Sequence, residues 1–371
     1  MREILAERLL AKVMKWNSRD VAQKMPDLLA LASYKFDEYQ QFSPGMKFIE
    51  SLALWINQFE SDEERKKAYE FVRLKLVFIS AKEMAHLVTV SYPDIIKPIL
   101  IQHVADKNNL PEYKVIKIVN SVEFNVLSRQ SLFLGLSDGA HTDILRRSNP
   151  EISNEQVYQT YEISEGRAKN MLHKLGEDLK KTFGREPLEE EKRFRMAFLL
   201  DDFSGSGLSY LRYEKSKYDG KVARFYNNIH DNKNPMSRLF DSSDIHIYII
   251  LYLATTQARK HLETIINKMF SPDKPQCTIQ IVHELKDSVK LNTDADKEFT
   301  KLLKKYYDDD IEDEHYLKGR HAKPYLGFDE CDIPLILNHN CPNNSVPILW
   351  FEEYRKYKGL FPRASRHGEK V

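Results

Sequence analysis

The sequence has few cysteines and no long apolar run. Its 371 residues include three cysteines, Cys277, Cys331 and Cys341. This small, odd number suits a reduced intracellular protein and argues against a disulfide framework. No stretch of about 18 apolar residues occurs, so no transmembrane helix is expected. Charged residues interrupt the apolar residues at the amino terminus, so no signal peptide is expected either. These absences predict a soluble, cytoplasmic protein without membrane association.

An excess of charge of either sign is also lacking. The formal net charge is +1, from 56 basic and 55 acidic residues. Global charge therefore argues neither for nor against a nucleic-acid partner, and any basic surface must be local. Hydrophobic residues make up 42% of the chain, which is enough to build a core. The length allows one large domain or two ordinary ones.

The first third of the chain is predicted to be helical. Glycine is absent between Gly45 and Gly135, and apolar residues recur at helical spacing from Ile4 onward. Ser61 and Asp62 precede a further helical segment as candidate N-cap residues. We therefore expect a helical domain over residues 1–125, with a role in assembly.

Beyond residue 130, short apolar runs alternate with helical segments. Near-continuous apolar strands separated by helices are typical of a parallel sheet covered on both faces. Residues 126–371 are therefore expected to form a Rossmann-like open α/β domain, with ligands at the carboxyl ends of the strands. The expected strands are 131–139, 195–202, 245–255, 277–285 and 333–340, with 157–164 as a further candidate.

The segment "FLLDDFSGSGLS" (198–209) places two acids at the end of an apolar strand. Ionised Asp201 and Asp202 can only accept hydrogen bonds, which suits a polyhydroxylated ligand. The following loop offers glycines, hydroxyls and, if a helix begins near Leu208, amino-terminal amides for a phosphate. Together these features indicate a ribose diol with a 5′-phosphate. The phosphate-binding residues would be Ser204, Gly205, Ser206, Gly207, Leu208 and Ser209.

The acid pair also fits two simpler interpretations. The two acids could merely begin a loop and cap a helix. Strands ending in Asp also occur in Walker B segments, but the chain has no G-x-x-x-x-G-K-[ST] motif, which argues against a P-loop NTPase.

The segment resembles the signature of type I phosphoribosyltransferases. That signature has four apolar residues, two acids, a short turn and Thr-Gly-x-Thr. Here "AFLL", Asp201-Asp202, "FSG" and Ser206-Gly207-Leu208-Ser209 follow the same order, with Ser in place of Thr. The resemblance implies that the acids hold the ribose hydroxyls of phosphoribosyl pyrophosphate (PRPP), bound with Mg²⁺. It also implies that the turn cradles the 5′-phosphate.

A second segment, "LFLGLSDGAHTDILRR", is another strand that runs into a turn of small residues. In the same family a loop after the first strand binds the pyrophosphate. The expected residues of this loop are Ser137, Asp138, Gly139 and Ala140, with Arg146 and Arg147 as partners for phosphate charge. Alternatively, this is an ordinary turn followed by a solvated arginine pair.

Over nearly its whole length the chain resembles the phosphoribosyltransferase-like proteins of bacterial conflict systems (PRTase-CE). That group usually has Thr-Pro-Asn-Asn after its last strand, where this chain has Cys341-Pro342-Asn343-Asn344. The loop's amides could recognise a base, although Asn-Asn after Pro is also normal turn chemistry and a Trp is often a core residue. The candidate acceptor-site residues are Asn340, Asn343, Asn344 and Trp350.

Two functions from different classes follow from these resemblances. The chain would be an anti-phage effector that transfers or cleaves at the anomeric carbon of PRPP or a related ribose phosphate. Alternatively, it would be a non-catalytic nucleotide sensor that controls a partner. Expected partners are other proteins of a defence locus, with a reverse transcriptase and its nucleic acid as one candidate. A homo-oligomer is a further option.

Three remaining features carry weaker expectations. The segment 212–235 is rich in Lys, Arg and Tyr, and is expected either to contact nucleic acid or to form a flexible insertion. The acidic run 308–315 is expected to be solvated and part of a mobile insertion. It could form a cation site, but no EF-hand spacing supports one. Cys331, His339 and Cys341 lack the paired spacing of a zinc site, so no protein-bound metal cluster is predicted.

Overall fold

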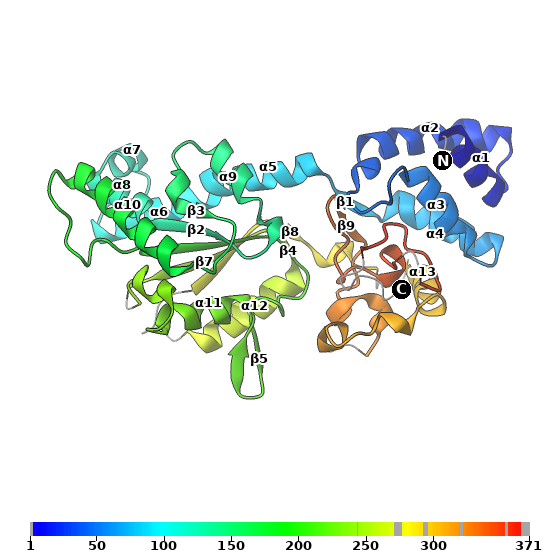
Figure 1. Ribbon diagram of the computed structural model, residues 1–371. Coiled ribbons are helices and arrows are strands. Elements are labelled where there is room, and N and C mark those ends of the chain that lie inside the picture. Colours follow the sequence, from blue (N-terminus) through cyan, green and yellow to red (C-terminus); the bar gives the residue numbers. More distant parts are fainter. Residues whose placement is uncertain are drawn as a thin grey trace. The chain divides into compact units, whose positions relative to one another are not determined.

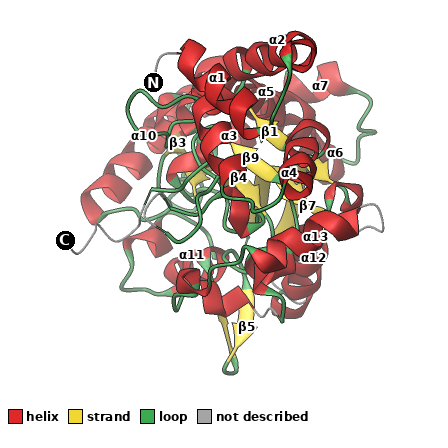
Figure 2. Ribbon diagram, turned by 90° about the vertical axis from the view of Figure 1, so that its right-hand side faces the viewer, coloured by secondary structure: helices red, strands yellow, loops and turns green. Residues whose placement is uncertain are grey.

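The structure, a computed structural model, describes residues 3–242, 244–270, 277–291, 296–319, 322–352 and 355–364 (Figures 1 and 2). Contacts divide the chain into two compact units. One contains residues 84–285. The other combines the described residues up to Glu83 with those from Lys286 onward. Among the described residues, no helix has both the length and the apolar character that a membrane crossing requires.

The unit of residues 84–285 is built on a five-stranded sheet with the order β3-β2-β4-β7-β8. Every neighbouring pair in this sheet is parallel, as the alternation of apolar runs and helices predicts. This confirms the expected α/β fold class. The strands are β2 (Ser131–Gly135), β3 (Val157–Tyr158), β4 (Met196–Ser204), β7 (His246–Thr255) and β8 (Cys277–Leu285).

Helices cover both faces of this sheet (Figure 1). Buried residues of α10, α11 and α12 pack on one face in a single apolar cluster. They extend the apolar pattern of the strands, where alternate residues point to that face. The helices of this unit are α5 (Ala81–Ser91), a π-helical turn (Tyr92–Ile96), α6 (Lys97–Lys107), α7 (Val115–Val119), α8 (Val122–Arg129), α9 (Thr142–Ser148), α10 (Glu165–Phe183), α11 (Lys221–His230) and α12 (Thr256–Met269).

The opposite face carries a row of aromatic rings. Phe133, Phe198 and Tyr248 are neighbours in register across three strands. Their rings stack with centroids 5.2 and 5.4 Å apart. Tyr92 lies edge-on to Phe133, and His103 Nε2 lies 2.7 Å from the Tyr248 hydroxyl. The helical segment 84–107 therefore covers this face of the sheet.

The division of the chain into units differs from the one expected, which placed a domain boundary at residue 125. Helices α5 to α7 were expected in a separate helical domain, but most of this segment belongs with the sheet. The sequence shows that these residues are helical and apolar, but not which apolar surface they cover. The sheet's aromatic face needs such a cover, because a parallel sheet buries both faces.

The other unit joins the beginning of the chain to its end. Its helices are α1 (Glu3–Val13), α2 (Ser18–Tyr34), α3 (Phe48–Asn57), α4 (Asp62–Leu74) and α13 (Lys297–Lys305). Helix α4 begins as predicted, because the Ser61 hydroxyl caps the amide of Glu64 and the Glu64 carboxylate accepts from the amide of Ser61.

The expected strand 333–340 does not join the main sheet. Only β9 (Leu335–Leu337) forms there, and it pairs in parallel with β1 (Val77–Ile79), which the sequence pattern did not predict. Both strands belong to the same unit, so β9 has its partner among the early residues of the chain. The candidate strand 157–164 is also shorter than expected, because β3 spans only Val157–Tyr158.

Candidate functional site

Two loops leave the sheet side by side at its carboxyl edge. β2 and β4 are neighbours, and Gly135 pairs in register with Leu200 at the end of β2. The amide of Leu136 then bonds the Leu200 carbonyl at 2.9 Å. The loop expected to bind pyrophosphate and the acid pair therefore lie next to each other, at the edge where open α/β sheets bind ligands.

The Asp201 carboxylate is buried and accepts several hydrogen bonds. The exposed fraction of this residue is 1%. Its Oδ1 accepts from the Ser137 hydroxyl and, at 3.2 Å, from the amide of Asp202. Its Oδ2 accepts from the Tyr210 hydroxyl and from Lys221 Nζ, each at 2.7 Å. Burial and the Asp202 charge raise the pKa of Asp201, while Lys221 and Ser137 oppose this rise. Four donors thus engage this carboxylate and link it to the neighbouring loop.

The β5–β6 hairpin brings Lys221 back to the acid pair. Its strands, Arg212–Glu214 and Lys217–Asp219, pair antiparallel. After the hairpin, Gly220 adopts a φ of +113°, and a Cβ there would lie 2.4 Å from the Tyr210 carbonyl oxygen. Only glycine allows this close approach. The Lys221 amide then bonds the Ser209 carbonyl at 3.1 Å. This bond fixes the backbone of Lys221 to the loop that follows the acid pair.

Asp202 is half-buried and faces the loop expected to bind pyrophosphate. A Cβ at Gly139 would lie 2.5 Å from Asp202 Oδ2, so glycine leaves room for this carboxylate in its present orientation. Ala140 is buried, and its carbonyl accepts from the Tyr252 hydroxyl at 2.8 Å. Ser137 is half-buried and Asp138 is exposed. The loop is thus anchored at both ends and touches both acids.

The loop after the acids folds on itself. Gly207 N donates to the Ser204 hydroxyl at 3.1 Å, and Leu208 N to the Ser206 hydroxyl at 3.4 Å. Of residues 204–209, only Ser209 is exposed. Gly207 has a φ of +79°, and a Cβ there would meet α12, which explains the glycine.

The helix expected to begin near Leu208 does not form. A turn occupies residues 208–210, and the next helix, α11, begins at Lys221. The hairpin takes the place of that helix. Any phosphate at this loop would therefore meet turn amides without a helix dipole.

The two arginines of α9 differ in their surroundings. Arg147 pairs with Asp143 at 3.8 Å and its side chain is 73% exposed. Arg146 lines a pocket of about 490 Å³ together with Arg167 and residues 157–160. Of the two arginines, Arg146 thus lines an open pocket within this unit, and Arg147 is exposed to solvent.

The candidate acceptor residues lie in the other unit. Trp350 is 5% exposed and donates its Nε1 to a backbone carbonyl at 2.7 Å. Asn344 is buried and donates Nδ2 to a backbone carbonyl at 3.2 Å. The Asn340 amide oxygen accepts a side-chain bond at 3.2 Å, and the Asn343 carbonyl accepts a backbone bond at 2.8 Å. These contacts hold the residues within their own unit, and an acceptor role for them stays a prediction.

The segment 212–235 is only partly buried, because the hairpin residues 212–219 are mostly exposed. The expected contact with nucleic acid and the expected flexible insertion both stay predictions. After the hairpin, α11 buries Val222, Ala223, Phe225 and Ile229. This part of the chain alternates basic and apolar residues, and the apolar ones occupy one helical face.

Sequence reasoning missed Lys221, Tyr210 and Tyr252 as parts of the site. Nothing in the local pattern distinguishes Lys221 from the other lysines of its basic segment. Its neighbour Gly220 is a signal of close backbone approach, but it does not identify the partner.

A family model described as PRTase-CE matches residues 52–363. Neither the curated proteins nor the solved structures that were compared contain a match.

Proposed function

Because the chain belongs to the PRTase-CE family and is phosphoribosyltransferase-like, we propose that it binds PRPP or a related ribose phosphate and transfers or cleaves at the anomeric carbon. One observation carries the proposal. The loop after β2 and the acids at the end of β4 are in direct contact, through the Ser137–Asp201 hydrogen bond and the close approach of Gly139 to Asp202. One ligand could therefore reach both.

The two acids have different roles in this proposal. Asp202 holds the ribose diol, because the four donors on Asp201 leave it little capacity for a ligand. Asp201 instead fixes the two loops relative to each other. The loop 137–140 binds the pyrophosphate. The loop 204–209 binds the 5′-phosphate. Its serine hydroxyls first release the amides of Gly207 and Leu208 and then turn to the ligand. Such catalysis rests on positioning and charge stabilisation.

In this proposal Mg²⁺ binds at the site together with the pyrophosphate. The carboxylates nearest to it in this proposal, Asp202 and the exposed Asp138, can accept hydrogen bonds from its bound waters. Asp201 is a poor direct ligand, because Lys221 already lies 2.7 Å from its Oδ2. When bound, the ion neutralises charge on the leaving pyrophosphate.

The test combines binding and turnover. Mg²⁺-PRPP should raise the melting temperature of the wild type and, with a suitable acceptor, release pyrophosphate. Asp202→Asn should lose the thermal shift. The exposed Glu112→Gln, which also removes one negative charge from the same unit, should keep it. If the wild type shows no shift with PRPP or any other ribose 5-phosphate, the proposed function is wrong.

The resting geometry also favours a second function, a nucleotide sensor without turnover. Four donors engage Asp201, and the hydroxyls of Ser204 and Ser206 accept from other amides of the same loop. A ligand would have to rearrange this loop, and a rearrangement can signal to a partner. Tight binding of a ribose phosphate without pyrophosphate release, with nucleobases, nucleotides or RNA as acceptors, would support the sensor and exclude the transferase.

We further propose an anti-phage setting, as the family resemblance implies. An enzyme with access to PRPP would drain a central metabolite, so a partner protein from its own locus would have to restrain it. Expression of the chain alone should then be toxic, and Asp202→Asn should relieve the toxicity. Growth unaffected by the chain, both alone and with its neighbours during infection, would contradict this setting.

A further inference from the structure

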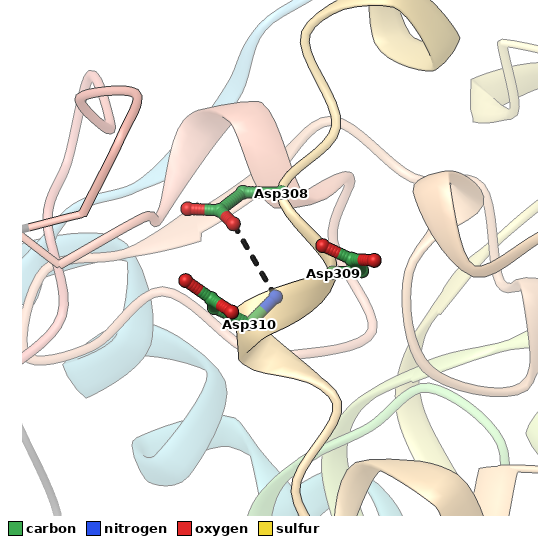
Figure 3. Close-up of side chains that lie close together, drawn as sticks. All are labelled: Asp308, Asp309 and Asp310. Carbon is green, nitrogen blue, oxygen red and sulfur yellow. Dashed lines mark hydrogen bonds between the residues drawn. The ribbon is translucent and has the colours of Figure 1, made fainter.

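Three consecutive carboxylates gather in the unit that does not contain the acid pair. Asp308 caps the short helical turn Asp309–Ile311, and its Oδ1 accepts from the amide of Asp310 at 3.3 Å. One oxygen from each of Asp308, Asp309 and Asp310 lies within 4.8 Å of the other two. Figure 3 shows the carboxylates of Asp308 and Asp310 on the same side of the turn, with Asp309 on the other side of the backbone.

Asp308 distinguishes this group from an ordinary exposed acidic run. Its exposed fraction is 4%, and its Oδ2 is buried without a hydrogen-bond partner among the described residues. The expectation of a solvated run holds for Asp309 and Asp310, which are exposed, but not for Asp308. A buried charge without a partner is costly, and proteins normally supply a counter-ion or a proton.

No described residue supplies that counter-ion through an ion pair. The Arg355 guanidinium is close, but its Nη1 donates to the backbone carbonyl of Asp310 at 2.8 Å and its Nε pairs with Glu352 at 3.2 Å. Lys and Arg side chains elsewhere in the described ranges form no ion pair with the three carboxylates either. The group thus places three negative charges around a buried oxygen that receives no hydrogen bond from the described residues.

We propose that Asp308, Asp309 and Asp310 bind a hard divalent cation, and that Ca²⁺ binds better than Mg²⁺. Carboxylate oxygens are the ligands that both ions prefer. Ca²⁺ accepts irregular sets of ligands completed by water, whereas Mg²⁺ demands near-ideal octahedral geometry. Three acids on one turn offer an irregular set. The ion would fix this turn and satisfy Asp308. The proposal does not depend on ribose-phosphate binding.

The test uses Tb³⁺, a luminescent substitute for Ca²⁺ that nearby tyrosines sensitise. Tyr307 directly precedes the site. Wild-type protein should show sensitised emission that Ca²⁺ displaces at lower concentration than Mg²⁺. Asp308→Asn should weaken Tb³⁺ binding by roughly tenfold or more, since it removes one of the three charges. Asp310→Asn, at an exposed position, should weaken it as well without threatening the fold.

Two matched controls separate this site from other acids. Glu314→Gln removes an exposed charge from the same acidic run and should leave the emission unchanged. Asp202→Asn should also leave it unchanged, because Asp202 belongs to the other site. Ca²⁺ should raise the wild-type melting temperature by roughly 2–5 °C, and Asp308→Asn should lose this rise. The proposal is overturned if the wild type does not respond to either ion. It is also overturned if Glu314→Gln weakens binding as much as Asp308→Asn, or if Asp202→Asn abolishes the emission.

Discussion

The two acidic groups of the chain are alike in sequence and opposite in surroundings. Asp201 is buried and receives bonds from Ser137, Tyr210 and Lys221. Asp308 is also buried, but its Oδ2 has no partner among the described residues. The first carboxylate is satisfied by its own fold and can organise loops. The second carboxylate has an oxygen that no described residue satisfies, and the proposed cation would satisfy it. Adjacent acids in a sequence therefore do not indicate which of them are available to a ligand.

The same contrast exists within the first pair. Asp201 and Asp202 are neighbours on one strand, and neighbouring strand residues point in opposite directions. Asp201 points into the protein, where four donors meet it, and Asp202 is half-buried beside Gly139. We therefore expect the two acids to respond differently to the same substitution.

The largest effect is expected from Asp202→Asn. It removes the charge that would hold the ribose diol, and losing a charge-assisted bond costs about 1.5–3 kcal/mol. Affinity for Mg²⁺-PRPP should fall by roughly ten- to a hundredfold, without loss of melting temperature, because two close acids repel each other. Asp201→Asn should weaken binding less. Isothermal titration of both variants checks this ranking, and equal losses would contradict the division of roles.

A second effect concerns Lys221. Lys221→Met leaves the buried Asp201 carboxylate without its cation, which should lower the free energy of unfolding by about 1–3 kcal/mol. In an Asp201→Asn background the same substitution should cost much less, because the charge that needs Lys221 is gone. Urea denaturation of the four proteins of this double-mutant cycle gives the coupling. A coupling near zero would mean that the Lys221–Asp201 contact does not stabilise the fold.

The sequence predicts the parts of this site that depend on local pattern. The apolar run 196–200 followed by two acids predicts β4 and its carboxyl-edge loop, and the small residues 137–140 predict the loop after β2. The alternation of strands and helices predicts a parallel sheet. These features follow from periodicity and turn chemistry, which are properties of short segments.

What the sequence could not predict depends on contacts between distant segments. Lys221 reaches Asp201 only because a hairpin returns the chain, and β9 pairs with β1 across most of the sequence. The helix expected near Leu208 fails because a hairpin replaces it. Contacts between distant segments decide these outcomes, and the pattern of a single segment does not contain them.

A smaller effect is expected from Gly139→Ala. The new methyl group would lie 2.5 Å from Asp202 Oδ2 and must displace that carboxylate. Because a carboxylate can rotate, stability should change little, whereas affinity for Mg²⁺-PRPP should fall by up to about tenfold, or roughly 1.4 kcal/mol. Gly166→Ala is the matched control, because nothing lies within 4 Å of its added Cβ. Unchanged affinity in Gly139→Ala would mean that the position of Asp202 is unimportant for binding.

The smallest expected effect is a pH dependence that arises from the titration of Asp201. Burial and the Asp202 charge raise the pKa of Asp201 above its ordinary value of 3.8. The folded protein therefore holds this proton over a pH range in which the unfolded chain has released it. The stability that Asp201 contributes is full below about pH 3.8 and is lost as the pH rises through the folded-state pKa.

The Asp201→Asn variant provides the reference, because asparagine does not titrate. The free energy of unfolding of the wild type, minus that of Asp201→Asn, should therefore fall as the pH rises above 3.8 and then level off. In an Asp202→Asn background this difference should fall over a narrower pH range, because the Asp202 charge helps to raise the pKa of Asp201. In a Lys221→Met background it should fall over a wider pH range, because Lys221 lowers that pKa. Urea denaturation at closely spaced pH values measures all three differences. A difference that instead rises with pH would show that Lys221, Tyr210 and Ser137 outweigh burial, and that the folded protein favours the ionised form of Asp201.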